Sequence, residues 1–348
     1  MKSFLALFSL CFLLVGDCEA QLGGSSVNTV FDVPSSARIS ALGGNQIAVM
    51  DNDLNLGVFN PALLNPSMAD QVTLSYLDWF SDINMGLASY AKHFDSLKTT
   101  FAATVQFVDY GSFQRTDPTG LELGTFSAGD YVVSIGAAQQ FDSIFSIGAS
   151  IKYMYSAYDS YSASGVAVDI GGVYAHKNGL FTIAAMLRNV GFQVNGFTEE
   201  KEDLPFNVQL GTTYKLKHAP FRLGLILENL QKWDLTFEDP NASVQIDPTT
   251  GQIIREEFTT ADKLLRHVII NNEVILSENF MLRVGYNFRR RAELAFDNKP
   301  GGVGLSYGIG LRLKKFHLSY GRASYHLAGA SNTFTVALRF EDFKRTGN

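Results

Sequence analysis

Polar and apolar residues alternate strictly along much of the chain. In the segment Ser143–Tyr155, every second side chain from Phe145 onwards is apolar or aromatic, whereas those between them are Ser, Gly, Lys and Met. A period of two places these two sets on opposite faces of a β-strand. An apolar outer face and a small, polar or charged inner face are typical of strands in transmembrane β-barrels. A soluble β-sandwich with an aromatic core is the alternative.

Fourteen segments from Gln71 onwards have the length and composition of strands. Most reach the roughly 9–11 residues that a tilted strand needs to cross a bilayer. An even number lets both ends of an antiparallel barrel lie on one side of the membrane. The sequence therefore predicts an all-β fold, a 14-stranded antiparallel transmembrane β-barrel, with strands at Gln71–Trp79, Ile83–Phe94, Lys98–Tyr110, Asp130–Phe141, Ser143–Tyr155, Ser160–His176, Leu180–Val190, Pro205–Lys217, Phe221–Trp233, His267–Leu276, Phe280–Arg289, Gly302–Lys314, Phe316–Tyr325 and Asn332–Glu341.

The connections between these segments alternate in length. Those after the even-numbered strands are turns of one to three residues, whereas long connections follow the third, seventh, ninth and eleventh strands. Outer-membrane barrels have short periplasmic turns and longer surface loops. We therefore expect an integral protein of the bacterial outer membrane, with surface loops at Gly111–Gly129, Gly191–Leu204, Asp234–Arg266 and Arg290–Gly301.

The chain divides into three predicted parts. Residues 1–20 have a basic start, an apolar run from Phe4 to Val15 and small residues at Cys18 and Ala20, which predicts a signal peptide and Sec export. A lipoprotein cysteine at Cys18 is the alternative. Residues 21–69 do not alternate, and we expect them to form an N-terminal plug in the barrel mouth. Residues 70–348 form the predicted barrel.

Three short helices are expected outside the strands. Ser35 and Ser36 can cap a helix that ends at the glycine pair Gly43-Gly44, and Asn60-Pro61 predicts a turn followed by a helical turn. Thr259 and Thr260 can cap a third helix within the longest loop. The first two lie in the predicted plug, and the third gives the longest loop some structure of its own.

Composition narrows the possible functions. Both cysteines fall within the predicted signal, so the remaining chain has no disulfide or thiol chemistry. A net charge of −6 argues against a nucleic-acid partner. No catalytic constellation, metal-ligand spacing or complete phosphate loop is present in the sequence, so we expect a non-enzymatic protein without a cofactor. The basic run Arg289-Arg290-Arg291 fits either contact with lipopolysaccharide or an ordinary interfacial cluster.

Three stretches near the N-terminus carry a family resemblance. They are Ser36–Gly44, with the sequence SARISALGG, then Asp51–Leu54, then Asn60–Leu64. In this order they resemble the start of the FadL-like barrels, which also have fourteen strands. Within that family, these stretches and Ser324–Asn332 resemble the PorQ group of type IX secretion system barrels from Bacteroidetes. The plug motif that carries the resemblance consists of Gly43, Gly44, Asn60, Pro61 and Ala62.

The resemblance implies a structural role at the cell surface. A barrel of this group anchors the attachment complex, docking PorZ together with the sortase PorU and the barrel PorV, in contact with outer-membrane lipid and lipopolysaccharide. We expect docking through the longest loop, at Asp239, Asp247, Arg255, Glu256 and Glu257. The alternative is a FadL-like transporter of hydrophobic small molecules across the outer membrane, with an apolar pocket lined by Leu54, Leu56, Val58, Phe59, Leu63 and Leu64.

Overall fold

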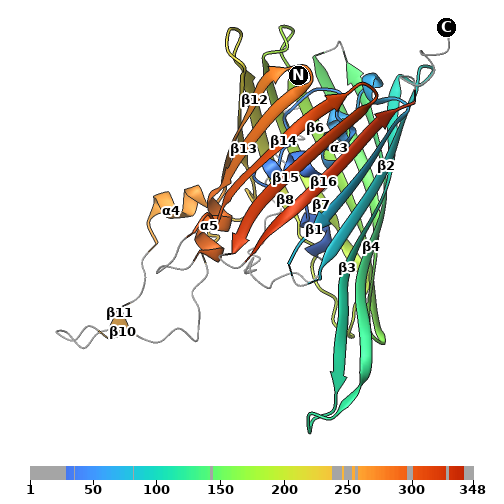
Figure 1. The fold of residues 1–348 in the computed structure, drawn as a ribbon, viewed down its shortest axis with the longest axis vertical. Coiled ribbons are helices and arrows are strands. Elements are labelled where there is room, and N and C mark those ends of the chain that lie inside the picture. The colour runs from blue at the N-terminus through green and yellow to red at the C-terminus, as the bar shows by residue number, and fades with distance from the viewer. Residues whose placement is uncertain are drawn as a thin grey trace, which may run out of the picture.

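A computed structural model describes residues 29–34, 36–80, 82–141, 144–236, 245–246, 253–254, 258–295, 301–326 and 329–340. In this part of the chain, fourteen antiparallel strands close into one barrel, because the first strand pairs with the last (Figure 1). The strands are β1 Gln71–Asp78, β2 Asn84–Phe94, β3 Thr99–Thr116, β4 Glu122–Phe141, β5 Phe145–Tyr158, β6 Tyr161–Ala175, β7 Phe181–Asn195, β8 Asn207–Lys215, β9 Phe221–Leu227, β12 Val268–Ser277, β13 Phe280–Asn287, β14 Leu305–Leu313, β15 Phe316–His326 and β16 Gly329–Arg339.

The alternation along each strand corresponds to two faces of the barrel wall. In β5, Phe145 is 42% exposed, whereas Ser146 next to it is 2% exposed, and burial continues to alternate along the strand. Ser146, Ser150 and Lys152 therefore point into the barrel, and the apolar side chains point outward. The predicted fourteen-stranded antiparallel barrel is confirmed, and each predicted strand overlaps an observed one.

The predicted ends of β3, β4 and β9 differ most from the observed ones. The predicted loop Gly111–Gly129 is mostly strand, because β3 and β4 continue to Thr116 and from Glu122 as a two-stranded arm beyond the barrel (Figure 1). Outside a membrane no lipid face is required, so the alternating apolar pattern that marks the other strands ends there. Conversely, β9 ends at Leu227 rather than at Trp233, because Asn229 has a φ of +58° and interrupts the regular strand, although Glu228 N still donates to His267 O at 2.9 Å.

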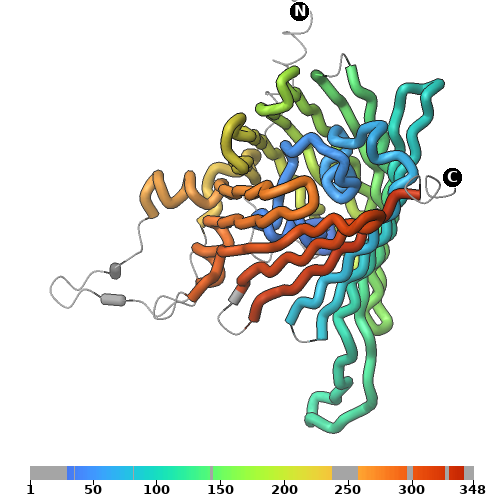
Figure 2. Tube along the Cα trace, turned by 45° about the horizontal axis from the view of Figure 1, so that its top comes forward, coloured from blue at the N-terminus to red at the C-terminus, as the bar shows by residue number. Residues whose placement is uncertain are grey.

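The N-terminal residues lie within the barrel. We call residues 29–34 and 36–69 the inner segment; Figure 2 shows it in blue, surrounded by the wall strands. Its elements are η2 Thr29–Asp32, α2 Ala37–Ala41, α3 Leu54–Phe59, η3 Pro61–Leu63 and η4 Pro66–Met68. Most of its side chains are buried against the wall. The assignment of residues 21–69 to a plug stays a prediction, because burial describes where residues lie and not whether they block passage.

Local sequence signals explain the short helices. Ser36 caps α2, with its Oγ accepting from Ile39 N, and Asn60 caps η3 by accepting from Ala62 N. In the loop, Thr259 begins α4 Thr260–Leu265 with a reciprocal capping box to Asp262. A further helix, α5 Phe288–Leu294, follows β13, and β10 Gln245–Ile246 pairs with β11 Ile253–Ile254. Within the described residues, no helix is long and apolar enough to cross a membrane.

Candidate functional site

A cluster of charged side chains joins the inner segment to the barrel wall. Helix α2 places Arg38 with its side chain inside the barrel, where it is 4% exposed. Its Nε donates to Glu273 Oε1 on β12 at 2.8 Å, and its Nη2 donates to Glu273 Oε2 at 2.9 Å. This paired geometry is the strongest arrangement that an arginine makes with a carboxylate. Arg38 and Glu273 therefore form an ion pair that joins the inner segment to the wall across 235 positions of sequence.

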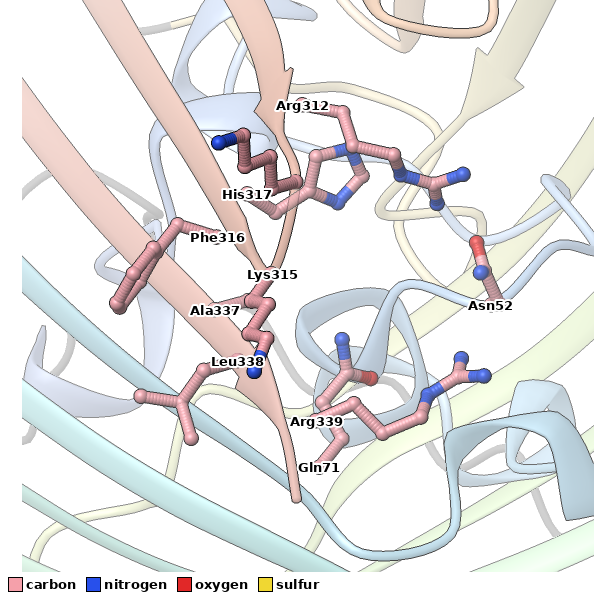
Figure 3. Close-up of a pocket in the computed structure, with 10 residues that line it drawn as sticks. Asn52, Gln71, Arg312, Lys315, Phe316, His317, Ala337, Leu338 and Arg339 are labelled. Atoms are coloured by element: carbon pink, nitrogen blue, oxygen red, sulfur yellow. The ribbon is translucent and has the colours of Figure 1, made fainter. Parts of the chain in front are cut away.

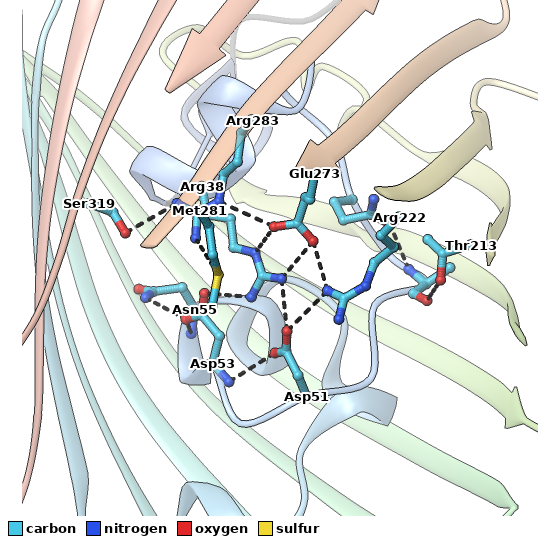
Figure 4. A network of polar contacts seen from close by, with 12 residues as sticks. Arg38, Asp51, Asp53, Asn55, Thr213, Arg222, Glu273, Met281, Arg283 and Ser319 are labelled. Carbon is cyan, nitrogen blue, oxygen red and sulfur yellow. Dashed lines mark hydrogen bonds and ion pairs between the residues drawn. The ribbon is translucent and has the colours of Figure 1, made fainter. Parts of the chain in front are cut away.

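Both residues of this ion pair have further partners. Arg38 also bonds Asp51 at 2.8 Å and Asp53 at 3.1 Å, two carboxylates of the inner segment (Figure 4). From the wall, Arg222 of β9 reaches Glu273 at 2.7 Å and Asp51 at 3.4 Å. A second wall arginine, Arg283 of β13, reaches Glu273 at 3.2 Å and Ser319 Oγ at 3.2 Å. We call these three arginines and three carboxylates the charge cluster.

The charge cluster is electrically balanced and largely shielded from water. Burial alone raises the pKa of the Asp51 carboxyl, but Arg38 and Arg222 together outweigh it and hold that pKa below its usual range. Removing one member of such a group leaves an uncompensated buried charge, which costs about 3–5 kcal/mol. The cluster can therefore hold the inner segment firmly in one place, and it gives way as a unit when one of its charges is lost.

The predicted glycine pair lies just after α2, against β12 and β13. Gly43 and Gly44 have φ angles of +95° and +93°, a region that favours glycine. A Cβ on Gly43 would lie 2.5 Å from Ile269 Cγ2 of β12. The carbonyl oxygen of Gly43 accepts from Asn287 Nδ2 and from Arg290 Nη2, both at 3.2 Å. The pair thus turns the chain and brings its backbone against the wall.

The predicted Asn-Pro-Ala step contacts a different side of the barrel. Asn60 Nδ2 donates to Ile47 O at 2.8 Å, which fixes the fold of the inner segment. Pro61 and Ala62 lie against glycines of the wall: a Cβ on Gly148 of β5 would come within 2.4 Å of Pro61. The structure therefore places the five motif residues at two separate contacts with the wall, and it does not bring them together. Their role as a plug motif stays a prediction.

A small cavity of about 40 Å³ lies between the inner segment and strands β3, β4, β5 and β7. One part of its lining is apolar and comes mostly from the inner segment. Another part carries two cations: Lys152, paired with Asp169 at 2.5 Å, and Arg188, whose guanidinium lies 4.1 Å from the centre of the Phe59 ring. The cavity is lined by Phe31, Val33, Val58, Phe59, Thr104, Gln106, Val132, Ser134, Lys152 and Arg188.

The cavity only partly matches the apolar pocket expected from the sequence. Val58 and Phe59 line it as expected, but four leucines do not. Their side chains pack instead against other inner-segment and wall residues. Those four are Leu54, Leu56, Leu63 and Leu64. Half of the lining residues are apolar and half are polar or charged, so the apolar half can contact one side of a small hydrophobic molecule. The present volume admits only a few atoms.

The structure shows where the basic run lies, but it does not describe the predicted docking residues of the longest loop. The run does not begin a surface loop but lies in α5, where Arg290 is buried and Arg289 reaches Glu228 at 3.2 Å. Arg290 lies 4.0 Å from the ring centre of Tyr325, so it is not available to lipopolysaccharide. The docking-loop residues Asp239, Asp247, Arg255, Glu256 and Glu257 lie outside the described residues, as do residues 1–20 of the expected signal.

Sequence reasoning missed the wall members of the charge cluster. Glu273, Arg222 and Arg283 each occupy inward positions of their strands, and inward charges were expected as a class. The sequence did contain two signals: the inward position of these charged residues along their strands, and the polar stretch Asp51–Asp53. Nothing local in the sequence pairs any of them with Arg38.

Comparison with known proteins supports the fold. No family model matches the chain, and no curated protein matches it by sequence. Among solved structures, the toluene transporter TbuX of Ralstonia pickettii is similar, with a TM-score of 0.54 and 10% identity over 90% of this chain and 100% of that one. A mutant of the monoaromatic hydrocarbon channel TodX has a TM-score of 0.50 and 12% identity, over 88% and 98% of the two chains.

These matches define the class of the protein at the level of fold. The chain is a closed fourteen-stranded antiparallel β-barrel similar to FadL-like outer-membrane channels. At such low identity the similarity concerns architecture alone. Nothing in these matches supports a role in type IX secretion.

Proposed function

We propose that this protein is an outer-membrane channel for small hydrophobic molecules, and that its inner segment is a plug that must move to let them pass. The observation that carries the proposal is the cavity between Phe31, Val58 and Phe59 of the inner segment and Val132 of the wall. The fold shared with two hydrocarbon channels supports it. The outward faces of the strands, with exposed apolar side chains such as Phe145 and Ile151, support a location in the membrane.

Movement follows from how the barrel is filled. The inner segment is buried on several sides, and a cavity of about 40 Å³ is smaller than any aromatic hydrocarbon. A hydrophobic molecule entering from the loop end therefore displaces part of the segment and takes over its apolar contacts. The side near β3 to β7 is the favoured path, and the inner segment clears it only when the charge cluster on the other side releases α2 from the wall.

Two neighbouring valines of β4 provide a test. Val132 is 6% exposed and lines the cavity, whereas Val133 is 50% exposed on the outer face. Uptake of radiolabelled toluene by whole cells displaying the protein measures passage. We expect Val132→Phe to slow uptake by about tenfold or more, on the scale of an added group in an apolar pocket, and Val133→Phe to leave it unchanged. Equal uptake by both variants, each present at wild-type levels, would contradict the proposal.

The arm formed by β3 and β4 favours a second function, docking of a protein partner at the cell surface. Beyond the barrel its two strands pair with one another, and Phe113, Leu123 and the turn residue Leu121 are exposed to solvent. Phe113 stacks on Phe126 with ring centres 5.4 Å apart. Exposed apolar side chains on a projecting element often mark an interaction site. Under this second proposal, the partners are those of an attachment complex, PorZ with PorU and PorV.

A further inference from the structure

A second and larger cavity lies at the end of the barrel where the strands join by short turns. Its volume is about 230 Å³, and it is formed by the ends of β14 and β16, the starts of β1 and β15, and Asn52 of the inner segment (Figure 3). Neither the charge cluster nor the smaller cavity includes these residues. Its lining consists of Asn52, Gln71, Arg312, Lys314, Lys315, Phe316, His317, Ala337, Leu338 and Arg339.

The cavity lining is strongly basic. Arg312, Lys314, Lys315 and Arg339 carry positive charge, the His317 ring adds nitrogen atoms that can hydrogen-bond a ligand, and no carboxylate lines the cavity among the described residues. The chain as a whole has a net charge of −6, so the positive charge of this cavity contrasts with the negative charge of the whole chain. Like charges placed together are unfavourable unless a counter-charge is present. Such a cavity fits an anionic ligand.

The fold brings these cations together through strand register. Arg312 of β14 pairs with His317 of β15, and His317 pairs with Ala337 of β16, so the three lie in one row across the wall. The tight turn between β14 and β15 adds Lys314 and Lys315. The arrangement is therefore fixed by the sheet and does not depend on a flexible loop.

Several groups in the cavity are free to bind. Among the described residues, the Arg312 guanidinium has no hydrogen bond or ion pair, and Figure 3 shows it extending toward Asn52. Gln71 accepts from Leu54 N at 3.2 Å through its Oε1, which leaves its amide NH2 as a donor. By contrast, Arg339 already donates to Ser67 O at 2.6 Å. The Asp53 carboxylate lies near His317 and is bonded to Arg38 at 3.1 Å, and it makes no ion pair with Arg312.

We propose that this cavity is a binding site for a phosphate ester, held by Arg312 and Lys314 with His317 beside them. Arginine matches phosphate oxygens with paired donors, and lysine adds charge without a fixed direction. The ligand is either a soluble phosphate monoester or the headgroup of a phospholipid, since Leu313 and Phe316, which flank the lysines, are exposed on the outer face.

Binding by the purified full-length protein in neutral detergent tests this site. One arm titrates glycerol 3-phosphate by calorimetry, with glycerol as the uncharged control. The other arm detects bound phosphatidylglycerol by native mass spectrometry. We expect at least one ligand to bind, and Arg312→Gln to weaken that binding by about ten- to a hundredfold, as loss of a charged hydrogen bond does. The matched control is Lys98→Gln, an exposed lysine in another short turn at the same end.

The outcomes separate the two sources and can overturn the site. Binding of glycerol 3-phosphate that is lost in Arg312→Gln supports a soluble ligand, and binding of phosphatidylglycerol alone, lost in the same variant, supports a headgroup. If Arg312→Gln does not fold, Lys314→Gln replaces it, because Lys314 is exposed in the turn. Absence of binding in both arms, or equal binding by wild type and the folded variant, would show that the cavity is not a phosphate site.

Discussion

At the scale of single residues, the contact between Arg38 and Glu273 is central to the lumen. Glu273 accepts from three arginines, Arg38, Arg222 and Arg283, and its side chain is 2% exposed. Two of these arginines belong to the wall and one to the inner segment. The position of the inner segment therefore depends on a single carboxylate more than on any other polar group of the charge cluster.

Replacing that carboxylate tests its importance. Glu273→Gln keeps the shape of the side chain but leaves three arginines facing two carboxylates, so we expect a loss of about 3–5 kcal/mol of stability. Thermal unfolding followed by circular dichroism, and proteolysis of the inner segment, measure the effect. Glu278→Gln, in the exposed turn after β12, is the control and should behave as wild type. Similar unfolding of the two variants would show that the charge cluster does not hold the segment.

At the scale of secondary-structure elements, the predictable features are those encoded over a few residues. Alternation predicted the strands, because a wall between lipid and a filled lumen requires opposite faces at successive residues. Caps at Ser36, Asn60 and Thr259 predicted short helices for the same local reason. The Arg38–Glu273 contact had no such signal, since its partners meet only when the inner segment lies inside the closed barrel.

The arm was not predicted because different forces stabilise it. Strands β3 and β4 have 18 and 20 residues, about twice the roughly 9–11 needed to cross a bilayer. Its outer part is a two-stranded ribbon with both edges open, which is marginally stable alone. The ion pair of Arg115 with Asp159, in the neighbouring β5–β6 turn, and the stacked Phe113 and Phe126 support it.

Shortening the arm tests the docking proposal. Replacing residues 112–127 by a short Gly-Ser turn removes only residues that lie beyond the barrel, so we expect the barrel to keep its unfolding temperature within a few degrees. If the arm docks PorZ and its associates, an affinity purification from the native membrane should lose these proteins, as identified by mass spectrometry. Recovery of the same partners with the shortened arm would assign docking elsewhere. Phe113→Ser in the intact arm gives a milder variant of the same comparison.

At the scale of the whole molecule, two kinds of contact fill one closed barrel. The charge cluster and the Gly43-Gly44 turn fix the inner segment toward β12 and β13, whereas apolar packing and a small cavity lie toward β3 to β7. A second cavity, lined by cations, lies at the short-turn end. Under the proposed channel function, passage requires displacement of the inner segment, with the wall remaining closed around it.

The most direct test of this account is to lock the inner segment to the wall. Ser40 Oγ of α2 lies 2.8 Å from Thr333 Oγ1 of β16, so Ser40→Cys with Thr333→Cys places two thiols within reach of a disulfide. Ser75→Cys with Thr335→Cys, whose oxygens lie 2.9 Å apart on β1 and β16, joins wall to wall and is the matched control.

Toluene uptake is then measured with each disulfide oxidised and reduced. The account predicts that the oxidised Ser40–Thr333 pair stops uptake, that a reductant restores it, and that the Ser75–Thr335 pair has little effect in either state. Undiminished uptake through a fully oxidised Ser40–Thr333 protein would contradict a moving plug and leave the barrel with another function.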